Sequence, residues 1–125
     1  MGAQEVETVR QMWIDYRERG VEAALGLLDP EVVFRSFEGE VHTGRDGVRT
    51  FFARFGGEMT FAASPYTFEP CGAGVVVAGH RRIRYPDRMD SQYMYFSHHV
   101  RQGLVVRVAA WADRESATRD LLAPP

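Results

Sequence analysis

Histidines are the first side chains of this sequence to consider for acid–base chemistry at neutral pH. The chain has four histidines, which are His42, His80, His98 and His99. A histidine that lies in an apolar cavity can serve as an acid or a base, because burial shifts its pKa. His98 and His99 are neighbours in an extended segment and point to opposite faces of a strand, so one of them at most can enter such a cavity.

The stretch GEVHTGRD, residues 39–46, has the glycine spacing with which a phosphate-binding loop begins. A P-loop continues with Lys and then Ser or Thr, whereas Arg45 and Asp46 follow the second glycine here. Glu40 lies inside the loop, and its charge would repel a phosphate. We therefore interpret this stretch as the connection between a strand and a helix, not as a nucleotide site.

The sequence offers no cysteine cluster for a metal, because Cys71 is its one cysteine, which also excludes an internal disulfide. His42 and Asp46 flank the same loop, but together with the histidines of the later strands they form no compact set of ligands. We predict no metal and no cofactor.

Length and composition are those of one globular domain, residues 1–125. The chain is 45% hydrophobic, and no apolar run reaches the roughly 18 residues that a membrane span needs. Its formal net charge of −2 gives no basic excess for nucleic acid, although all 15 basic residues are Arg. The first residues lack the basic and apolar regions of a secretory signal, so we expect a cytoplasmic protein that binds neither nucleic acid nor membrane.

Apolar periodicity divides the chain into helices followed by strands. Residues 5–19 and 21–28 have helical spacing, residues 32–37 are typical of a strand, and a third helix follows Gly44 with Thr43 or Asp46 as its N-cap. Period-two alternation then predicts strands at 59–70, 74–85, 91–102 and 104–112, and Asp113 caps a last short helix at 114–122. This order predicts an α+β fold in which three N-terminal helices pack on a curved antiparallel sheet.

The strands at 74–85 and 91–102 can be aligned as a hairpin about the turn PDRM. With Tyr85 opposite Asp90, Val77 lies opposite His98, and directly opposed residues share a face. His98 then lies on a mostly apolar face that we expect to pack against the helices. A slip of one residue would exchange the two faces and place His99 there instead.

The other face of the same hairpin is polar and aromatic. It carries His80, Arg82, Arg84, Tyr93 and Tyr95. Because Tyr and Arg are enriched in interface cores, we predict that this face forms a homodimer.

The chain resembles the SnoaL-like polyketide cyclase and ketosteroid isomerase proteins of the nuclear transport factor 2 superfamily. The resemblance rests on the segments YRERGVEAALGLLDPEVVFRS, TGRDGVRTFF and VRQGLVVRVAAWADRESA, and it covers nearly the whole chain. It implies a cone-shaped fold with a pocket between sheet and helices, and a dimer packed through the open face of the sheet. The fold alone does not fix a function, because isomerases, cyclases, epoxide hydrolases, dehydratases and inert binding modules share it.

The isomerase residues of that family are not conserved in this sequence. Trp13 stands where the resemblance places the oxyanion-donating Tyr, and Ser36 stands where it places the general-base Asp. The third position, an acid that donates to the oxyanion, corresponds to Phe96 or His98, depending on register. The carboxylate that an epoxide hydrolase would need on the last strand falls at Ala110. The resemblance therefore implies neither the ketosteroid isomerase mechanism nor the epoxide hydrolase mechanism for this chain.

The residues left as a candidate site are aromatic and apolar, with few polar groups. We predict His98 as acid or base with help from the Tyr16 hydroxyl, although a core histidine is the simpler interpretation of His98. The predicted ligand pocket consists of Trp13, Phe34, Ser36, Phe52, Phe55, Arg81, Phe96 and Ala110. We expect a protein that binds or transforms a small hydrophobic molecule of polyketide or steroid type, as an isomerase, cyclase or dehydratase. The alternative is a non-catalytic binding or dimerisation module.

Overall fold

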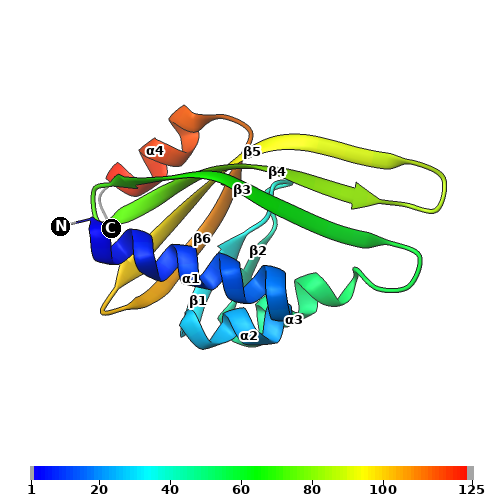
Figure 1. Cartoon of the computed structure of the whole chain (residues 1–125), viewed down its shortest axis with the longest axis horizontal. Helices are drawn as coiled ribbons and strands as arrows, with labels where there is room; N and C mark the ends of the chain where they lie inside the picture. The colour runs from blue at the N-terminus through cyan, green and yellow to red at the C-terminus, as the bar shows by residue number, and fades with distance from the viewer. Residues whose placement is uncertain (1, 124–125) are drawn as a thin grey trace.

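The computed structural model describes residues 2–123 as one curved six-stranded sheet with helices on both sides (Figure 1). The helices are α1 (Ala3–Arg19), α2 (Val21–Ala24), α3 (Gly44–Ala53) and α4 (Arg114–Leu122), and a 3-10 turn, η1 (Leu25–Leu27), follows α2. The strands are β1 (Leu28–Arg35), β2 (Val41–Thr43), β3 (Thr60–Cys71), β4 (Gly74–Arg84), β5 (Met89–Arg101) and β6 (Leu104–Trp111). The helices α1, α2 and α3 lie on one face of the sheet, here called the inner face, and α4 lies on the outer face.

The predicted α+β fold is confirmed, and the sheet has the order β2-β1-β6-β5-β4-β3. It is mixed and not purely antiparallel, because β1 pairs in parallel with β6, where Phe34 lies opposite Val108. The short strand β2, which we did not predict, pairs with β1 across a turn at Gly39, whose φ of 94° favours glycine. This hairpin occupies most of the stretch that resembled a phosphate loop.

The hairpin of β4 and β5 has a tighter turn than we predicted. Tyr85 donates its backbone N–H to the carbonyl of Arg88 over 2.8 Å, so Pro86 and Asp87 form the tip of the turn and Val77 lies opposite Phe96. The predicted pairs are therefore wrong by two positions. The predicted faces are nevertheless correct, because a shift of two residues preserves the alternation of side chains. His98 is fully buried on the inner face, and His99 is partly exposed on the outer one.

The second helix ends earlier than predicted, because β1 already begins at Leu28. Pro30 lies within β1, in the interval between Leu28 and Val33 where the pairing with β6 is irregular. A proline has no N–H to donate to a ladder, so this interval accommodates it without the loss of a hydrogen bond.

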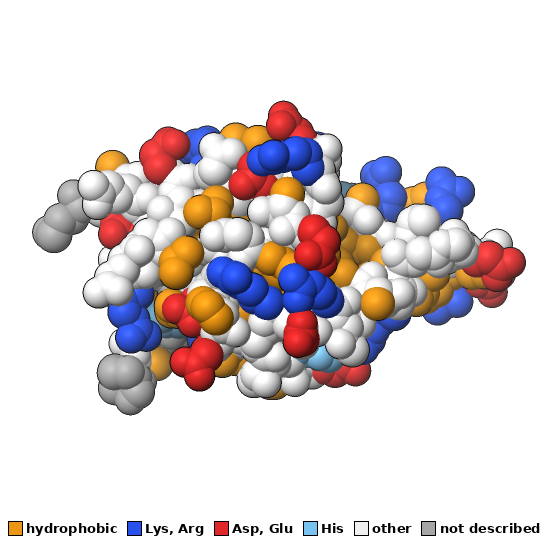
Figure 2. Space-filling view, turned by 90° about the horizontal axis from the view of Figure 1, so that it is seen from below, with side chains coloured by type: hydrophobic (Ala, Val, Ile, Leu, Met, Phe, Trp, Pro, Cys, Tyr) orange, Lys and Arg blue, Asp and Glu red, His pale blue; other side chains and the backbone are white. Residues whose placement is uncertain are grey.

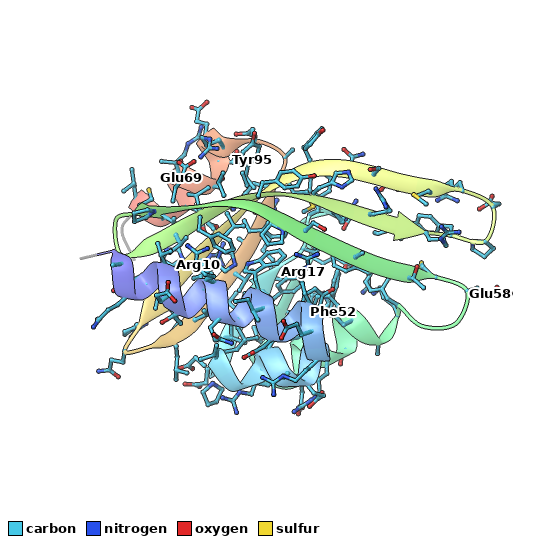
Figure 3. The ribbon with its side chains drawn as sticks, in the orientation of Figure 1. Arg10, Arg17, Phe52, Glu58, Glu69 and Tyr95 are labelled. Atoms are coloured by element: carbon cyan, nitrogen blue, oxygen red, sulfur yellow. The ribbon has the colours of Figure 1, made fainter. Side chains whose placement is uncertain are left out.

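The main core lies between α1 and the inner face of the sheet. Val9, Met12 and Trp13 of α1 pack there against Val77 and Phe96 of the central strands. A smaller cluster lies on the outer face, where Ala117 and Leu121 of α4 contact Val76. Figure 3 shows the two sides, with Glu69 and Tyr95 toward α4 and Phe52 on the side of α1.

A polar network also fixes α4 to the outer face. The Asp120 carboxylate accepts hydrogen bonds from the Ser97 hydroxyl over 2.7 Å and from Arg107 over 3.0 Å. The Trp111 indole N–H donates in turn to the Ser97 hydroxyl over 3.0 Å. The network joins α4 to β5 and β6 through Ser97, Arg107 and Trp111, while the buried Nδ1 of His99 has no hydrogen-bond partner among residues 2–123.

Candidate functional site

An apolar cavity lies on the inner face, between α1, the segment of α2 and η1, α3 and the sheet. Its volume is about 90 Å³, and its accessible surface is entirely apolar. Its walls are Met12, Trp13, Tyr16, Val21, Ala24, Leu25, Leu28, Phe34, Val48, Phe52, Phe61, Ala63, Phe96, His98 and Val108. We call this space the inner cavity.

Two polar side chains in the wall of the inner cavity bind each other. The Trp13 indole N–H donates to Nε2 of His98 over 3.2 Å, and this joins α1 to β5. Because Nε2 accepts this hydrogen bond, the neutral imidazole carries its proton on Nδ1. Nδ1 is buried and has no hydrogen-bond partner among residues 2–123. Nε2, the nitrogen that could take a proton from a ligand, therefore already accepts a hydrogen bond from Trp13.

Burial determines the charge of His98. It lowers the pKa of the imidazole from 6.5 to about 4, and the backbone groups of Val75 and Phe96 oppose this shift without forming a hydrogen bond of good geometry. A charged imidazolium would lose its hydration in this apolar wall. His98 is therefore neutral at pH 7.

The Tyr16 hydroxyl is the other polar group near the inner cavity. Its ring packs against Phe52, with 5.7 Å between ring centroids, and against Trp13 at 6.3 Å. Burial raises the pKa of Tyr16 to about 12, so the hydroxyl keeps its proton. Within the described part of the chain this hydroxyl forms no side-chain hydrogen bond, which leaves it free to donate to a ligand.

A second, more open space of about 440 Å³ adjoins the inner cavity. We call it the outer chamber. Its walls are Tyr16, Val21, Glu22, Arg49, Phe52, Ala53, Phe55 and Phe61. Tyr16, Val21, Phe52 and Phe61 belong to both spaces, so they form the partition between them.

The structure brings most of the predicted pocket residues together. Trp13, Tyr16, Phe34, Phe52, Phe96 and His98 line the inner cavity, and Phe55 lines the outer chamber. Ser36 and Ala110 lie elsewhere. The Ser36 hydroxyl accepts the backbone N–H of Glu40 in the turn after β1, and Ala110 is buried in the sheet opposite Phe96.

Arg81 is buried on the inner face but lies outside the walls of both spaces. Its guanidinium donates to Glu38 over 2.9 Å and to Asp90 over 3.1 Å, and it lies 4.7 Å from the ring centroid of Phe37. Two carboxylates thus neutralise its charge. This arrangement joins the turn after β1 to the hairpin of β4 and β5, and leaves little of the charge for an acidic ligand.

Several lining residues were not among those that we predicted. Ala24, Leu25 and Leu28 come from the segment around η1, and Ala63 comes from β3. Their apolar character was evident, but only the tertiary fold decides which apolar residues border a space. Among residues 2–123, no group of three or more His, Cys, Asp or Glu side chains could hold a metal. None of the helices described is long and apolar enough to span a membrane.

Solved structures of other proteins have the same architecture as this chain. No protein-family profile and no curated protein sequence matches the chain. Among solved structures, TerC co-crystallised with polyporic acid is 24% identical, with a TM-score of 0.73 over 98% of this chain and 100% of that one. A protein of unknown function from Burkholderia pseudomallei, described as nuclear transport factor 2-like, is 23% identical, with a TM-score of 0.71 over 97% and 99%. The chain has the nuclear transport factor 2-like fold.

The same fold occurs in proteins with very different sequences. A Mycobacterium tuberculosis protein solved in complex with estradiol-17beta-hemisuccinate is 13% identical, with a TM-score of 0.72 over 90% of this chain and 95% of that one. In this nuclear transport factor 2-like fold the inner cavity lies between the helices and the inner face of the sheet. At such low identity the similarity establishes the fold only, and any chemistry has to be inferred from the residues of the site.

Proposed function

We propose that this protein binds a small hydrophobic molecule in the inner cavity. The observation that carries the proposal is a space between helices and sheet with an entirely apolar surface, adjoined by a larger and more polar chamber. The inner cavity alone, at about 90 Å³, is smaller than the roughly 300–1,000 Å³ of sites for drug-sized ligands. A ligand of that size would extend through the partition at Tyr16 and Phe52 into the outer chamber.

The residues support binding better than proton transfer. His98 is neutral, and its Nε2 already accepts a hydrogen bond from Trp13. Ser36, which replaces the general-base Asp of the related isomerases, does not line the cavity and accepts a backbone N–H instead. Tyr16 also lines the more polar outer chamber, where its hydroxyl remains as a donor that could hold a ligand oxygen in place.

Two proteins of the same fold support this choice of ligand. TerC was co-crystallised with polyporic acid, and the M. tuberculosis protein was solved with a steroid derivative. Both compounds are largely hydrophobic and carry oxygen groups. We extend to this chain only the general class, a hydrophobic molecule with a hydrogen-bonding oxygen.

Titration with octan-1-ol tests the proposal. We expect saturable binding, because each CH₂ buried in the apolar cavity contributes about 0.8 kcal/mol against the cost of association. Ala63 lines the cavity, so Ala63→Phe should fill it and weaken binding at least about tenfold, whereas Ala62→Phe on the outer face should leave the Kd unchanged.

Calorimetry measures the Kd, and thermal unfolding verifies that each variant folds. Absence of binding, or equal affinity of wild type and Ala63→Phe, would refute the proposal; Ala63→Leu provides a smaller filling residue if Ala63→Phe does not fold.

We further propose a homodimer through the outer face of the sheet. Tyr93 is 72% exposed and Tyr66 is 57% exposed, and Tyr93 packs against His80 on this face with 5.4 Å between ring centroids. Light scattering should give twice the chain mass of 14.2 kDa, and Tyr93→Glu should give the monomer. Ile14→Glu, at an exposed apolar position of α1, should remain dimeric. A wild-type mass of 14.2 kDa at high concentration would contradict the dimer.

A further inference from the structure

The outer chamber differs from the inner cavity because its wall contains an ion pair. Glu22 of α2 and Arg49 of α3 both line it. Arg49 donates from Nε and Nη2 to the two carboxylate oxygens of Glu22 over 2.7 Å and 3.1 Å, and from Nη1 to Asp46 over 2.6 Å. Figure 2, which views the molecule from the side of these helices, shows acidic and basic side chains interspersed with apolar ones.

Arg49 retains hydrogen-bonding capacity that this arrangement does not use. A guanidinium has five N–H donors, and three of those of Arg49 point to Glu22 and Asp46. The Glu22 carboxylate has further lone pairs, since each oxygen accepts one hydrogen bond from Arg49. The pair therefore offers both donors and acceptors to a molecule in the outer chamber. Arg49 and Glu22 are 45% and 65% exposed, so the head of a ligand in the outer chamber can reach both side chains.

The partition between the two spaces determines the shape of a molecule that could reach this pair. Tyr16, Val21, Phe52 and Phe61 separate an apolar end from a polar end. A molecule that fills the inner cavity and extends past Phe52 arrives at Glu22 and Arg49. Its apolar end and its polar group must therefore lie at opposite ends.

We propose that the ligand of this protein is an elongated amphiphile with a neutral hydroxyl or amide head, and that Arg49 and Glu22 select this head. The inference rests on the proposed binding function of the inner cavity. It adds a recognition site for the head group, in which Arg49 donates to the head and Glu22 accepts from it.

The charges around the outer chamber favour a neutral head over a charged one. A carboxylate head would approach a guanidinium that already holds two carboxylates, and it would lie beside Glu22. A protonated amine head would lie beside Glu22, but the carboxylate of Glu22 is already paired with Arg49, so the two charges in the wall cancel and give neither sign of head a net attraction. A hydroxyl or amide loses less hydration than a charged head and can both accept and donate a hydrogen bond.

Three probes with one apolar chain and different heads test this selection, namely octan-1-ol, octanoate and octylamine, the last protonated at pH 7. At low ionic strength, where exposed charges are least screened, octan-1-ol should bind the wild-type protein more tightly than either charged probe. Glu22→Gln should strengthen octanoate binding about threefold to fivefold, as expected for exposed charges, and Arg49→Gln should strengthen octylamine binding by a similar factor. The exposed pair of Glu115 and Arg119 on α4 supplies the matched controls, because Glu115→Gln and Arg119→Gln should change none of these affinities.

The outcomes separate this inference from the proposed function. If Ala63→Phe abolishes binding of all three probes but Glu22→Gln and Arg49→Gln leave their relative affinities unchanged, the head-group site is refuted and the cavity function stands. If a charged probe binds the wild type most tightly, the selection for a neutral head is refuted. If Ala63→Phe has no effect on any probe, the proposed function fails, and the head-group site fails with it.

Discussion

Acidification from pH 7 to pH 4 is expected to remove about 3 kcal/mol of stability through His98 alone. Burial lowers the pKa of this imidazole from 6.5 in the unfolded chain to about 4 in the folded one. A lowered pKa means that the unfolded state binds the proton more readily as the pH falls. The contribution of His98 is therefore fully present above pH 6.5 and is lost between pH 6.5 and about pH 4.

Urea unfolding at pH 7, 5.5 and 4 measures this loss, with His98→Gln as the control. A glutamine side chain can still accept the Trp13 N–H but does not titrate, and carboxylates and His99 contribute to both proteins alike. The free energy of unfolding of the wild type should fall by about 3 kcal/mol more than that of His98→Gln over this range. Parallel losses in the two proteins would show that His98 is protonated or exposed in the folded state.

Gly74→Ala is expected to destabilise the protein by about 3 kcal/mol, at the upper end for an overpacked core. Gly74 lies beside the strand that carries His98, under α4. A Cβ at this position would collide with the backbone carbonyl of His98 and would lie 2.6 Å from Cδ2 of Leu121. The carbonyl belongs to the sheet and cannot move aside as a flexible side chain could, so β4, β5 and α4 would have to separate.

Denaturant unfolding of Gly74→Ala beside Gly26→Ala measures this effect. A Cβ on Gly26 would meet nothing within 4 Å, so that variant should remain close to the wild type. A Gly74→Ala protein within about 1 kcal/mol of the wild type would mean that α4 packs less closely on the sheet than described here.

Local patterns in the sequence predicted the elements other than β2 and η1, and they predicted the faces of β4 and β5. Asp113 is the N-cap that we expected, since its side chain accepts the backbone N–H of Ser116 over 2.7 Å. Thr43 occupies the N-cap position of α3 without a side-chain hydrogen bond, and Asp46 pairs with Arg49 instead. The alternation of apolar residues placed His98 on the inner face, and this assignment survived the error in register because that error was an even number of residues.

The features that the sequence did not predict depend on contacts between distant segments. Trp13 and His98 are 85 residues apart, and nothing near either of them indicates that one binds the other. We predicted Arg81 in the ligand pocket, because no local pattern indicates its pairing with Glu38, which lies 43 residues away. The parallel pairing of β1 with β6 likewise joins segments that are far apart in the sequence, and it is decided by packing and not by local propensity.

The position of a bound ligand tests the central claim most directly. Nuclear Overhauser effects between octan-1-ol and the protein should connect the terminal methyl group to the Trp13 indole and the Phe96 ring, which both line the inner cavity. The methylene next to the hydroxyl should contact Arg49 in the outer chamber. Contacts to Tyr66 and Tyr93 on the outer face of the sheet, with none to Trp13, would contradict the account.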